Sequence, residues 1–180
     1  MNLIYKKFDI LDSNFQENFR KYERSFLQLL QNCYQEFYGN SYHSDRIRQS
    51  SSIVYLALNN DSLVGASYVK RNLRRGGTVV APEYRGMGVG EHLVKMSLTD
   101  FPHQYSILST NLNYSHRMLS LMEKVGFKKA MGVEIIKTIV GEEFECMSNF
   151  RIENGYFIFD RESKRRNGVK RIGLTLLHTF

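Results

Sequence analysis

The most informative segment of the chain is residues 80–90, which read Val80-Ala81-Pro82-Glu83-Tyr84-Arg85-Gly86-Met87-Gly88-Val89-Gly90. A β-favouring segment precedes it, and glycines stand at alternate positions within it. The amphipathic pattern over residues 88–100 predicts a helix that begins immediately. Such a loop can turn successive backbone N–H groups into one concavity at the positive end of a helix, because glycine permits close approach or a positive φ. The segment therefore predicts a diphosphate-binding loop.

Other phosphate-binding motifs fit this segment poorly. The chain has no Gly-x-x-x-x-Gly-Lys-[Ser/Thr] sequence, which excludes a P-loop NTPase. The glycines follow Gly-x-Gly-x-Gly, and a predicted hairpin precedes them, whereas a Rossmann dinucleotide site has Gly-x-Gly-x-x-Gly in a first βαβ unit. A glycine-rich turn without a ligand remains the alternative.

Periodicity along the chain predicts an α/β fold, in which helices pack on a mixed β-sheet. The expected helices cover residues 15–37, 45–49, 88–100 and 115–125, the last ended by Gly126. The expected strands cover residues 3–10, 53–58, 63–70, 78–81, 105–111, 128–140 and 172–180, with a hairpin over 150–159 that turns at Asn154-Gly155. No internal repeat and no linker requires a second domain.

Two motifs carry a resemblance to a known family. The residues Val-x-Pro-x-Tyr-Arg-Gly-x-Gly-Val-Gly resemble the acyl-CoA-binding motif of the GNAT superfamily of N-acyltransferases, with its core at Arg85, Gly88 and Gly90. Residues 115–127 are similar to the family's Asn-x-x-Met/Ala-x-x-Leu-Tyr-x-x-x-Gly-Phe helix. The resemblance implies a GNAT-like core over residues 1–140 with splayed central strands, and residues 141–180 as a β-rich extension of the same domain.

The resemblance implies an acyl-CoA-dependent N-acyltransferase, most simply one that moves an acetyl group from acetyl-CoA to a primary amine by direct attack. Arg85 would pair with a phosphate oxygen, the pantetheine arm would bind along Val79 and Val80, and the Val80 N–H would polarise the thioester carbonyl. The residues expected to bind the coenzyme are Val79, Val80, Arg85, Gly86, Met87, Gly88, Val89, Gly90, Glu91, Asn113 and Ser115.

The chain departs from the family pattern where a proton donor and a pantetheine ligand are expected. Met122 stands where many relatives carry the Tyr that is thought to protonate the thiolate, and Ser115 stands where many carry Asn, so Asn113 is the candidate substitute. The candidate catalytic groups are Val80, Glu83 as a base, and Tyr114. Other open candidates for the base are His43, Asp45, His116, Glu142, Glu143 and Glu145. A catalytically silent acyl-CoA-binding or regulatory module is the alternative function.

The net charge of +7 is concentrated in two clusters. Residues 70–75 carry +4 and residues 161–171 carry +5, so the rest of the chain is slightly acidic. The first cluster borders the predicted coenzyme strand, which predicts an acceptor with a carboxylate or phosphate, or an acidic macromolecular surface. Its members are Lys70, Arg71, Arg74 and Arg75. The second cluster lacks interleaved aromatic residues, which disfavours a nucleic acid partner.

Composition sets the remaining expectations. Two cysteines supply neither a disulfide framework nor a metal set, so no metal is expected. The longest apolar run, residues 53–58, is too short to span a bilayer, and the first residues do not read as a signal peptide. We expect a reduced, cytoplasmic protein that acts on a small-molecule or peptide amine, with a homodimer as one open alternative for residues 141–180.

Overall fold

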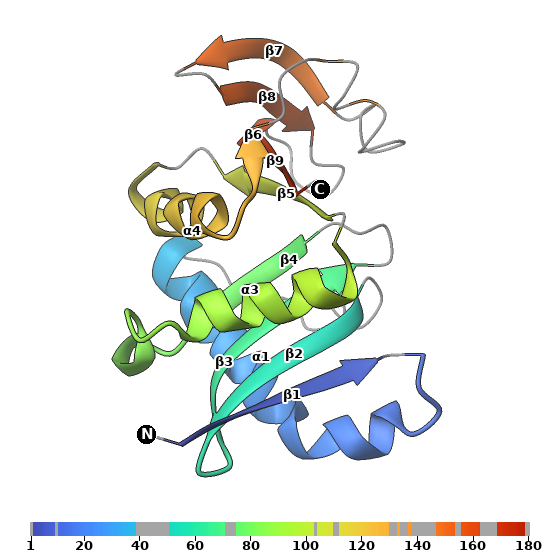
Figure 1. The fold of residues 1–180 in the computed structure, drawn as a ribbon. Helices are drawn as coiled ribbons and strands as arrows, with labels where there is room; N and C mark the ends of the chain where they lie inside the picture. The colour runs from blue at the N-terminus through green and yellow to red at the C-terminus, as the bar shows by residue number, and fades with distance from the viewer. Residues whose placement is uncertain are drawn as a thin grey trace. The chain divides into compact units, whose positions relative to one another are not determined.

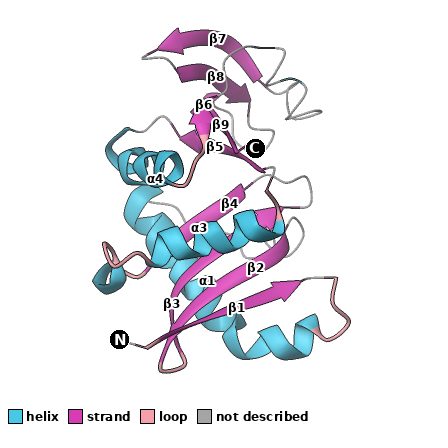
Figure 2. Ribbon diagram, viewed as in Figure 1, coloured by secondary structure: helices cyan, strands magenta, loops and turns pink. Residues whose placement is uncertain are grey.

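The computed structural model describes residues 2–9, 11–38, 51–70, 75–102, 104–109, 112–129, 133, 137, 147–153, 156–162 and 169–178. The chain forms two compact units, Met1–Pro102 and His103–Phe180. Helices and strands are present in both units (Figure 2).

The first unit is built on an antiparallel sheet of four strands. Their order across the sheet is β1 (Leu3–Asp9), β2 (Ser51–Asn59), β3 (Ser62–Lys70) and β4 (Arg75–Val80). Helix α1 (Phe15–Tyr38) lies behind this sheet and helix α3 (Val89–Asp100) lies in front of it in the view of Figure 1. Each helix covers one face, so the sheet is buried on both sides.

The hairpin expected before the glycine loop is confirmed as β2–β3, and its turn is formed by two residues. Asn60 and Asp61 have φ angles of 47° and 64°, as the two central residues of a tight hairpin turn of the primed type require. Asn and Asp tolerate this left-handed conformation better than other residues with a side chain. The turn therefore fixes the register of the two central strands.

Two apolar layers follow from the alternation of side chains along the strands. Behind the sheet, one apolar side of α1 packs on Val54, Leu56 and Leu58. Its buried members are Phe19, Tyr22, Phe26, Leu29, Leu30 and Cys33. In front of the sheet, Val89 and Leu93 of α3 belong to the second buried cluster. The β4 strand is thereby held between two helices.

The second unit contains a five-stranded antiparallel sheet. Its elements are β5 (Gln104–Ser109), helix α4 (Leu112–Lys124), β6 (Lys128–Lys129), β7 (Met147–Glu153), β8 (Tyr156–Glu162) and β9 (Val169–His178). The strand order is β5-β9-β8-β7, and β6 also pairs with β9. Glu153 pairs with Tyr156, which leaves the two positions between them for the predicted turn and confirms the hairpin.

Three sequence-based expectations differ from the structure or fall outside it. A continuous strand over 128–140 is wrong, because among the described residues of this segment 128–129 are extended whereas Val133 and Lys137 have helical backbones. The β4 strand begins at Arg75 and not at residue 78. The helix expected over 45–49 lies outside the described residues.

The helices that the structure describes include none with both the length and the apolar character needed to cross a membrane.

Candidate functional site

Among the described residues, no strand of the first sheet pairs with the outer edge of its last strand, β4. Ala81 N–H donates to Val64 O at 2.9 Å, and Val79 lies opposite Ala66 in the same register. Because backbone groups alternate between the two sides of an antiparallel strand, those of Val79 face β3 and those of Val80 face the outer edge. Val80, and not Val79, therefore offers its N–H to a ligand beside β4.

A short turn reverses the chain after β4. Residues Pro82–Tyr84 form one 3₁₀ turn, in which Tyr84 N–H donates to Ala81 O at 2.9 Å. The Tyr84 hydroxyl accepts a hydrogen bond of 3.0 Å from Asn59 Nδ2 at the end of β2. This contact anchors the turn to the sheet and directs the next residues back toward β4.

Arg85 follows this turn, and its side chain contacts the end of β4. The Arg85 Nε–H donates to Val80 O at 3.0 Å, and its terminal nitrogen lies 3.9 Å from Cys33 Sγ in α1. The expected role of Arg85 was to pair with a phosphate. In the structure its guanidinium binds the carbonyl of the residue expected to polarise the thioester.

The glycines of the loop are required by backbone conformation and not by space. Gly86 and Gly88 have φ angles of +81° and +79°, in the left-handed region that disfavours residues with a Cβ. A Cβ added at either position would meet nothing within 4 Å. Met87, between the two glycines, is 55% exposed, so its side chain does not belong to the core.

The loop ends at the amino terminus of α3. His92 N–H donates to Gly88 O at 3.0 Å, which is the first hydrogen bond of the helix. The amides of Gly88, Val89 and Gly90 precede this bond and so have no acceptor within the helix. They lie at the positive end of the helix dipole, which favours an anion. The backbone thus has amides at a helix amino terminus, which is the feature that the predicted anion site needs.

A close contact sets this helix end against the sheet. A Cβ added at Gly65 in β3 would lie 2.8 Å from Val89 Cγ1, so the first residue of α3 packs directly on the β3 backbone. Val89 is 1% exposed. The glycine at position 65 therefore fixes where the loop amides stand relative to β4.

The position of Arg75 corrects the expectation of an exposed acceptor-side cluster. Arg75 is 3% exposed, and its guanidinium donates to the hydroxyls of Ser67, Thr78 and Ser97 between the sheet and α3. Burial lowers the pKa of Arg75 to about 10, which still leaves it cationic at neutral pH. Arg75 is an internal link between β3, β4 and α3, and it does not face an acceptor in solution.

The other cluster residues and the candidate base are placed only in part. Lys70 is half-buried at the end of β3, whereas Arg71 and Arg74 lie outside the described residues. Glu83 is exposed on the 3₁₀ turn. Glu91 pairs with Lys95 at 2.8 Å, so its contribution to anion binding rests on its backbone amide.

The residues expected from the second motif lie in the second unit. Asn113, Tyr114 and Ser115 belong to the first turns of α4, and their side chains lie outside the described set, as do those of His43, Asp45, His116, Glu142, Glu143 and Glu145. Met122 is 2% exposed, so the side chain at the usual Tyr position is enclosed by the protein. Gly126 has the positive φ, 98°, predicted for the residue that ends α4.

Sequence reasoning missed the hydroxyl layer beneath α3. Ser67 and Thr78 face each other across β3 and β4, with their oxygens 2.9 Å apart, and Ser97 donates to Val94 O at 2.7 Å. A usable signal was present, because Ser97 interrupts the apolar side of α3 at a core-facing position. A buried hydroxyl on such a side requires a polar partner from the sheet.

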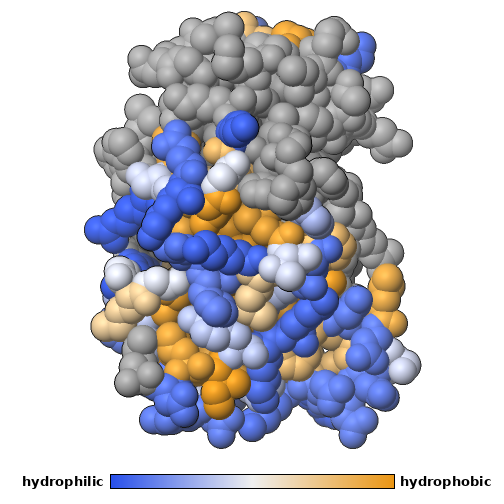
Figure 3. Space-filling model, in the orientation of Figure 1, coloured by the Kyte–Doolittle hydropathy of each residue, from blue (hydrophilic) through white to orange (hydrophobic). Residues whose placement is uncertain are grey.

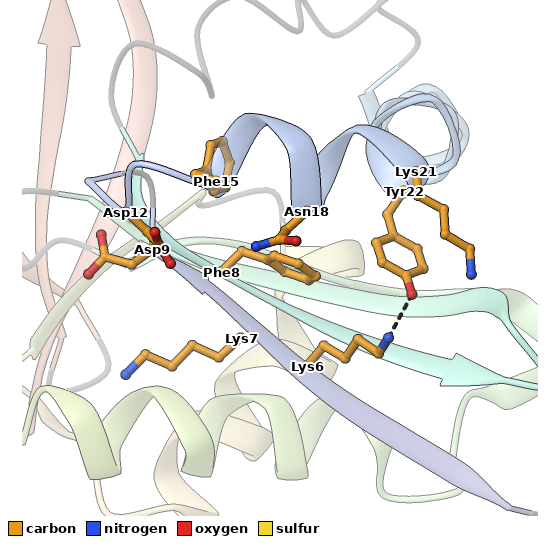
Figure 4. Close-up of a pocket in the computed structure, with 9 residues that line it drawn as sticks. All are labelled: Lys6, Lys7, Phe8, Asp9, Asp12, Phe15, Asn18, Lys21 and Tyr22. Carbon is orange, nitrogen blue, oxygen red and sulfur yellow. Dashed lines mark hydrogen bonds between the residues drawn. The ribbon is translucent and has the colours of Figure 1, made fainter.

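A separate hollow of about 480 Å³ lies between β1 and the start of α1 (Figure 4). It stands at the opposite edge of the sheet from β4. Its three lysines are already engaged, because Lys6 donates to Tyr22, Lys7 pairs with Asp100 and Lys21 pairs with Asp61. The lining residues are Lys6, Lys7, Phe8, Asp9, Asp12, Phe15, Asn18, Lys21 and Tyr22. None of the residues expected to bind the coenzyme lines this hollow.

Hydrophilic residues cover most of the coloured surface in Figure 3, with smaller hydrophobic areas between them. The exposed large apolar side chains among the described residues are Ile4, Leu11, Met87 and Val133. Single exposed apolar side chains are normal on soluble proteins and indicate no docking surface.

Comparison with known sequences gives two matches. A family model described as "Acetyltransferase (GNAT) domain" matches residues 19–140. The N-alpha-acetyltransferase 30 of Schizosaccharomyces pombe is 27% identical over 118 residues, which are 59% of this chain and 78% of that protein.

Solved structures share the fold at low sequence identity. The NatC complex bound to Gag peptide and CoA contains a chain with 16% identity and a TM-score of 0.57, over 100% of this chain and 99% of that one. The ribosomal-protein-S18-alanine N-acetyltransferase of Escherichia coli has 8% identity and a TM-score of 0.55, over 98% of this chain and 96% of that one. These similarities confirm the predicted fold class.

Proposed function

This chain belongs to the GNAT acetyltransferase family, and we propose that it transfers an acetyl group from acetyl-CoA to a primary amine by direct attack. The observation that carries the proposal is the continuous path from the open edge of β4, through Gly86 and Gly88 with positive φ, to the amino terminus of α3. Strand edges bind extended ligands and helix amino termini bind phosphates, so this path suits a molecule with both parts.

The loop would hold the coenzyme's diphosphate with uncharged backbone groups. The amides of Gly88, Val89 and Gly90 have no acceptor within α3, and a diphosphate would supply one. The pantetheine arm would then run along the outer edge of β4. This mode of binding explains why the net charge of the chain need not contact the coenzyme.

The thioester would react at the end of β4. The amine nitrogen would bond to the carbonyl carbon, with the developing negative charge on oxygen stabilised by Val80 N–H. The C–S bond would then break, and its electron pair would leave with the coenzyme sulfur. We propose Glu83 as acceptor of the amine proton and Tyr114 as donor to the sulfur. A thiol pKa of about 8.5 also allows the sulfur to leave as a thiolate.

We propose a peptide or small-molecule amine as the acceptor. The relatives named for N-alpha and ribosomal-protein acetylation make peptides with a free amino terminus the first candidates. Lys70, Arg71 and Arg74 remain the proposed acceptor-side cluster, and they would favour an acidic acceptor. Asn113 and Ser115 remain proposed pantetheine ligands.

Release of free CoA thiol from acetyl-CoA tests the proposal directly. We expect turnover with at least one amine from a panel of acidic, neutral and basic peptides and small amines, and none with the Gly88→Glu variant. That variant places a carboxylate where a phosphate would bind. A wild-type protein that binds CoA but releases no thiol with any amine would contradict transferase activity.

A silent coenzyme-binding module is the second candidate. The enclosed Met122 favours it, because this position offers no ionisable group to protonate the sulfur. Calorimetry with CoA together with the thiol assay separates the two candidates. Tight binding without turnover would identify the module, whereas amine-dependent turnover would exclude it.

A further inference from the structure

Arg85 lies in the coenzyme-binding motif, but its side chain is directed at the end of β4. We propose that Arg85 is a positioning residue, which holds the Val80 peptide and places its charge beside the thioester carbonyl, and that it does not bind a coenzyme phosphate. The inference rests on the proposed function, because Val80 N–H is the group proposed to stabilise the developing charge.

The peptide that joins Val80 and Ala81 is held at both of its polar groups. Its N–H, on Ala81, donates to Val64 O at 2.9 Å, and its C=O, on Val80, accepts from Arg85 Nε at 3.0 Å. The first bond links the peptide to β3, and the second links its outward-facing carbonyl to Arg85. This peptide cannot rotate without breaking a charge-assisted hydrogen bond. The Val80 N–H belongs to the adjoining Val79–Val80 peptide, so Arg85 restrains it through the backbone of Val80 and not by direct contact.

The guanidinium also lies on the side from which a thioester would approach. The N–H and C=O of Val80 face the same edge of β4, because they belong to one residue of an antiparallel strand. A cation bound to the C=O therefore adds a favourable field at the neighbouring N–H. It also occupies one of the two acceptor positions of the Val80 carbonyl, and the next outward-facing carbonyl for a pantetheine amide is that of Thr78.

A third contact keeps the Arg85 side chain at this place. Its terminal nitrogen lies 3.9 Å from Cys33 Sγ, and the same sulfur lies 3.8 Å from Val80 O. Cys33 is 3% exposed on the buried side of α1. The guanidinium thus bridges Cys33 of α1 and Val80 at the end of β4, neither of which belongs to the glycine loop.

Comparing acetyl-CoA with S-acetylpantetheine tests this inference, because the second compound lacks the diphosphate and the nucleotide. We expect Arg85→Met to lower kcat/KM by about 10- to 100-fold with both compounds, as expected for loss of a charged hydrogen bond. The affinity for free CoA, measured by calorimetry, should change by less than about threefold. Arg20→Met, which removes an exposed charge from α1, is the matched control and should behave as the wild type.

A phosphate contact predicts the opposite result. The loss would then be confined to acetyl-CoA, CoA affinity would fall at least about tenfold, and Arg85→Lys would restore binding as a point charge. This result would overturn the positioning role while leaving the proposed function intact. If Arg85→Met does not fold, Arg85→Lys supplies the same comparison, because lysine keeps the charge but lacks the Nε–H.

A wild-type protein without turnover would instead contradict the proposed function. In that case the affinity for CoA alone distinguishes a protein-internal role of Arg85 from a phosphate contact. Unchanged affinity in Arg85→Met supports the protein-internal role, whereas a loss of about tenfold in Arg85→Met with recovery in Arg85→Lys overturns it.

Discussion

The guanidinium of Arg75 donates to the hydroxyl of Thr78 at 2.8 Å, within the layer that separates the first sheet from α3. Both residues belong to β4, and the same guanidinium also reaches Ser97 on the helix. This link ties the strand proposed to carry the thioester to the helix proposed to hold the diphosphate. A positive charge that the sequence placed at the surface is in fact part of the scaffold of the site.

Replacing Arg75 should destabilise the protein. We expect Arg75→Met to lower the free energy of unfolding by about 1–3 kcal/mol, because the buried hydroxyls of Ser67 and Ser97 and the partly buried hydroxyl of Thr78 lose a charged donor. Arg20→Met on the exposed side of α1 should change it by less than about 0.5 kcal/mol. Urea denaturation measures both. Equal stability of the two variants would contradict the scaffold role. A change in the salt dependence of the acceptor KM in Arg75→Met would indicate that Arg75 contacts the acceptor.

Local chemistry explains which features the sequence could predict. The Asn60-Asp61 turn and the glycines at 86 and 88 are required by φ angles that few other residues adopt, so each is readable from its own segment. Family resemblance supplied the coenzyme and the reaction class. These features need no knowledge of distant contacts.

Features that depend on distant partners were not predictable in this way. Arg75 reads as part of a basic cluster until β3 and α3 place three hydroxyls around it. The contact from Arg85 to Val80 O depends on how the 3₁₀ turn reverses the chain. Val133 lies in a segment rich in β-branched residues yet has a helical backbone, so strand propensity did not predict its conformation.

Substitutions at Gly88 should show whether CoA affinity depends on the backbone conformation at this position or on the space available for a side chain. We expect Gly88→Ala to weaken CoA binding by about tenfold, because a Cβ at a φ of +79° costs about 1–2 kcal/mol and the strained loop would shift its amides. Gly88→Asn should weaken it less, since Asn tolerates the left-handed region. Calorimetry with CoA measures both. A loss with Gly88→Asn that is larger than with Gly88→Ala would show that side-chain volume, and not φ, is what the loop excludes.

Tyr55 should make the protein less stable at alkaline pH. Burial, aided by the hydrogen bond of 2.7 Å to Asp100, raises the pKa of Tyr55 above its usual value of 10.0. The unfolded chain ionises first, so the stabilisation is complete below pH 10 and is lost as pH rises above it. We expect Tyr55→Phe to cost about 1 kcal/mol at pH 7.

The difference in free energy of unfolding between wild type and Tyr55→Phe should therefore decrease above about pH 10. All other titrating groups are common to the two proteins, so their effects cancel in the comparison. Denaturant midpoints at neutral and alkaline pH measure this difference. A difference that stays constant over the whole range would show that the phenol ionises equally in both states.

The effects of substitutions at Gly76 and Tyr68 on stability should depend on each other, because the Tyr68 ring fills the space next to Gly76. A Cβ added at Gly76 would lie 1.9 Å from Cε2 of Tyr68, at the irregularity in pairing between β3 and β4. We expect Gly76→Ala to destabilise the fold by about 1–3 kcal/mol through overpacking. Tyr68→Leu removes the ring, so the double variant should be more stable than the sum of the single changes by at least about 1 kcal/mol.

Gly86→Ala combined with Tyr68→Leu is the matched control for this pair. A Cβ at Gly86 meets nothing within 4 Å, so its cost arises from φ alone and should add to that of Tyr68→Leu within about 0.5 kcal/mol. Urea denaturation of both sets gives the two coupling energies. Additive behaviour at Gly76 would mean that the strand shifts away from Tyr68 without strain, and the position of β4 would then not depend on this contact.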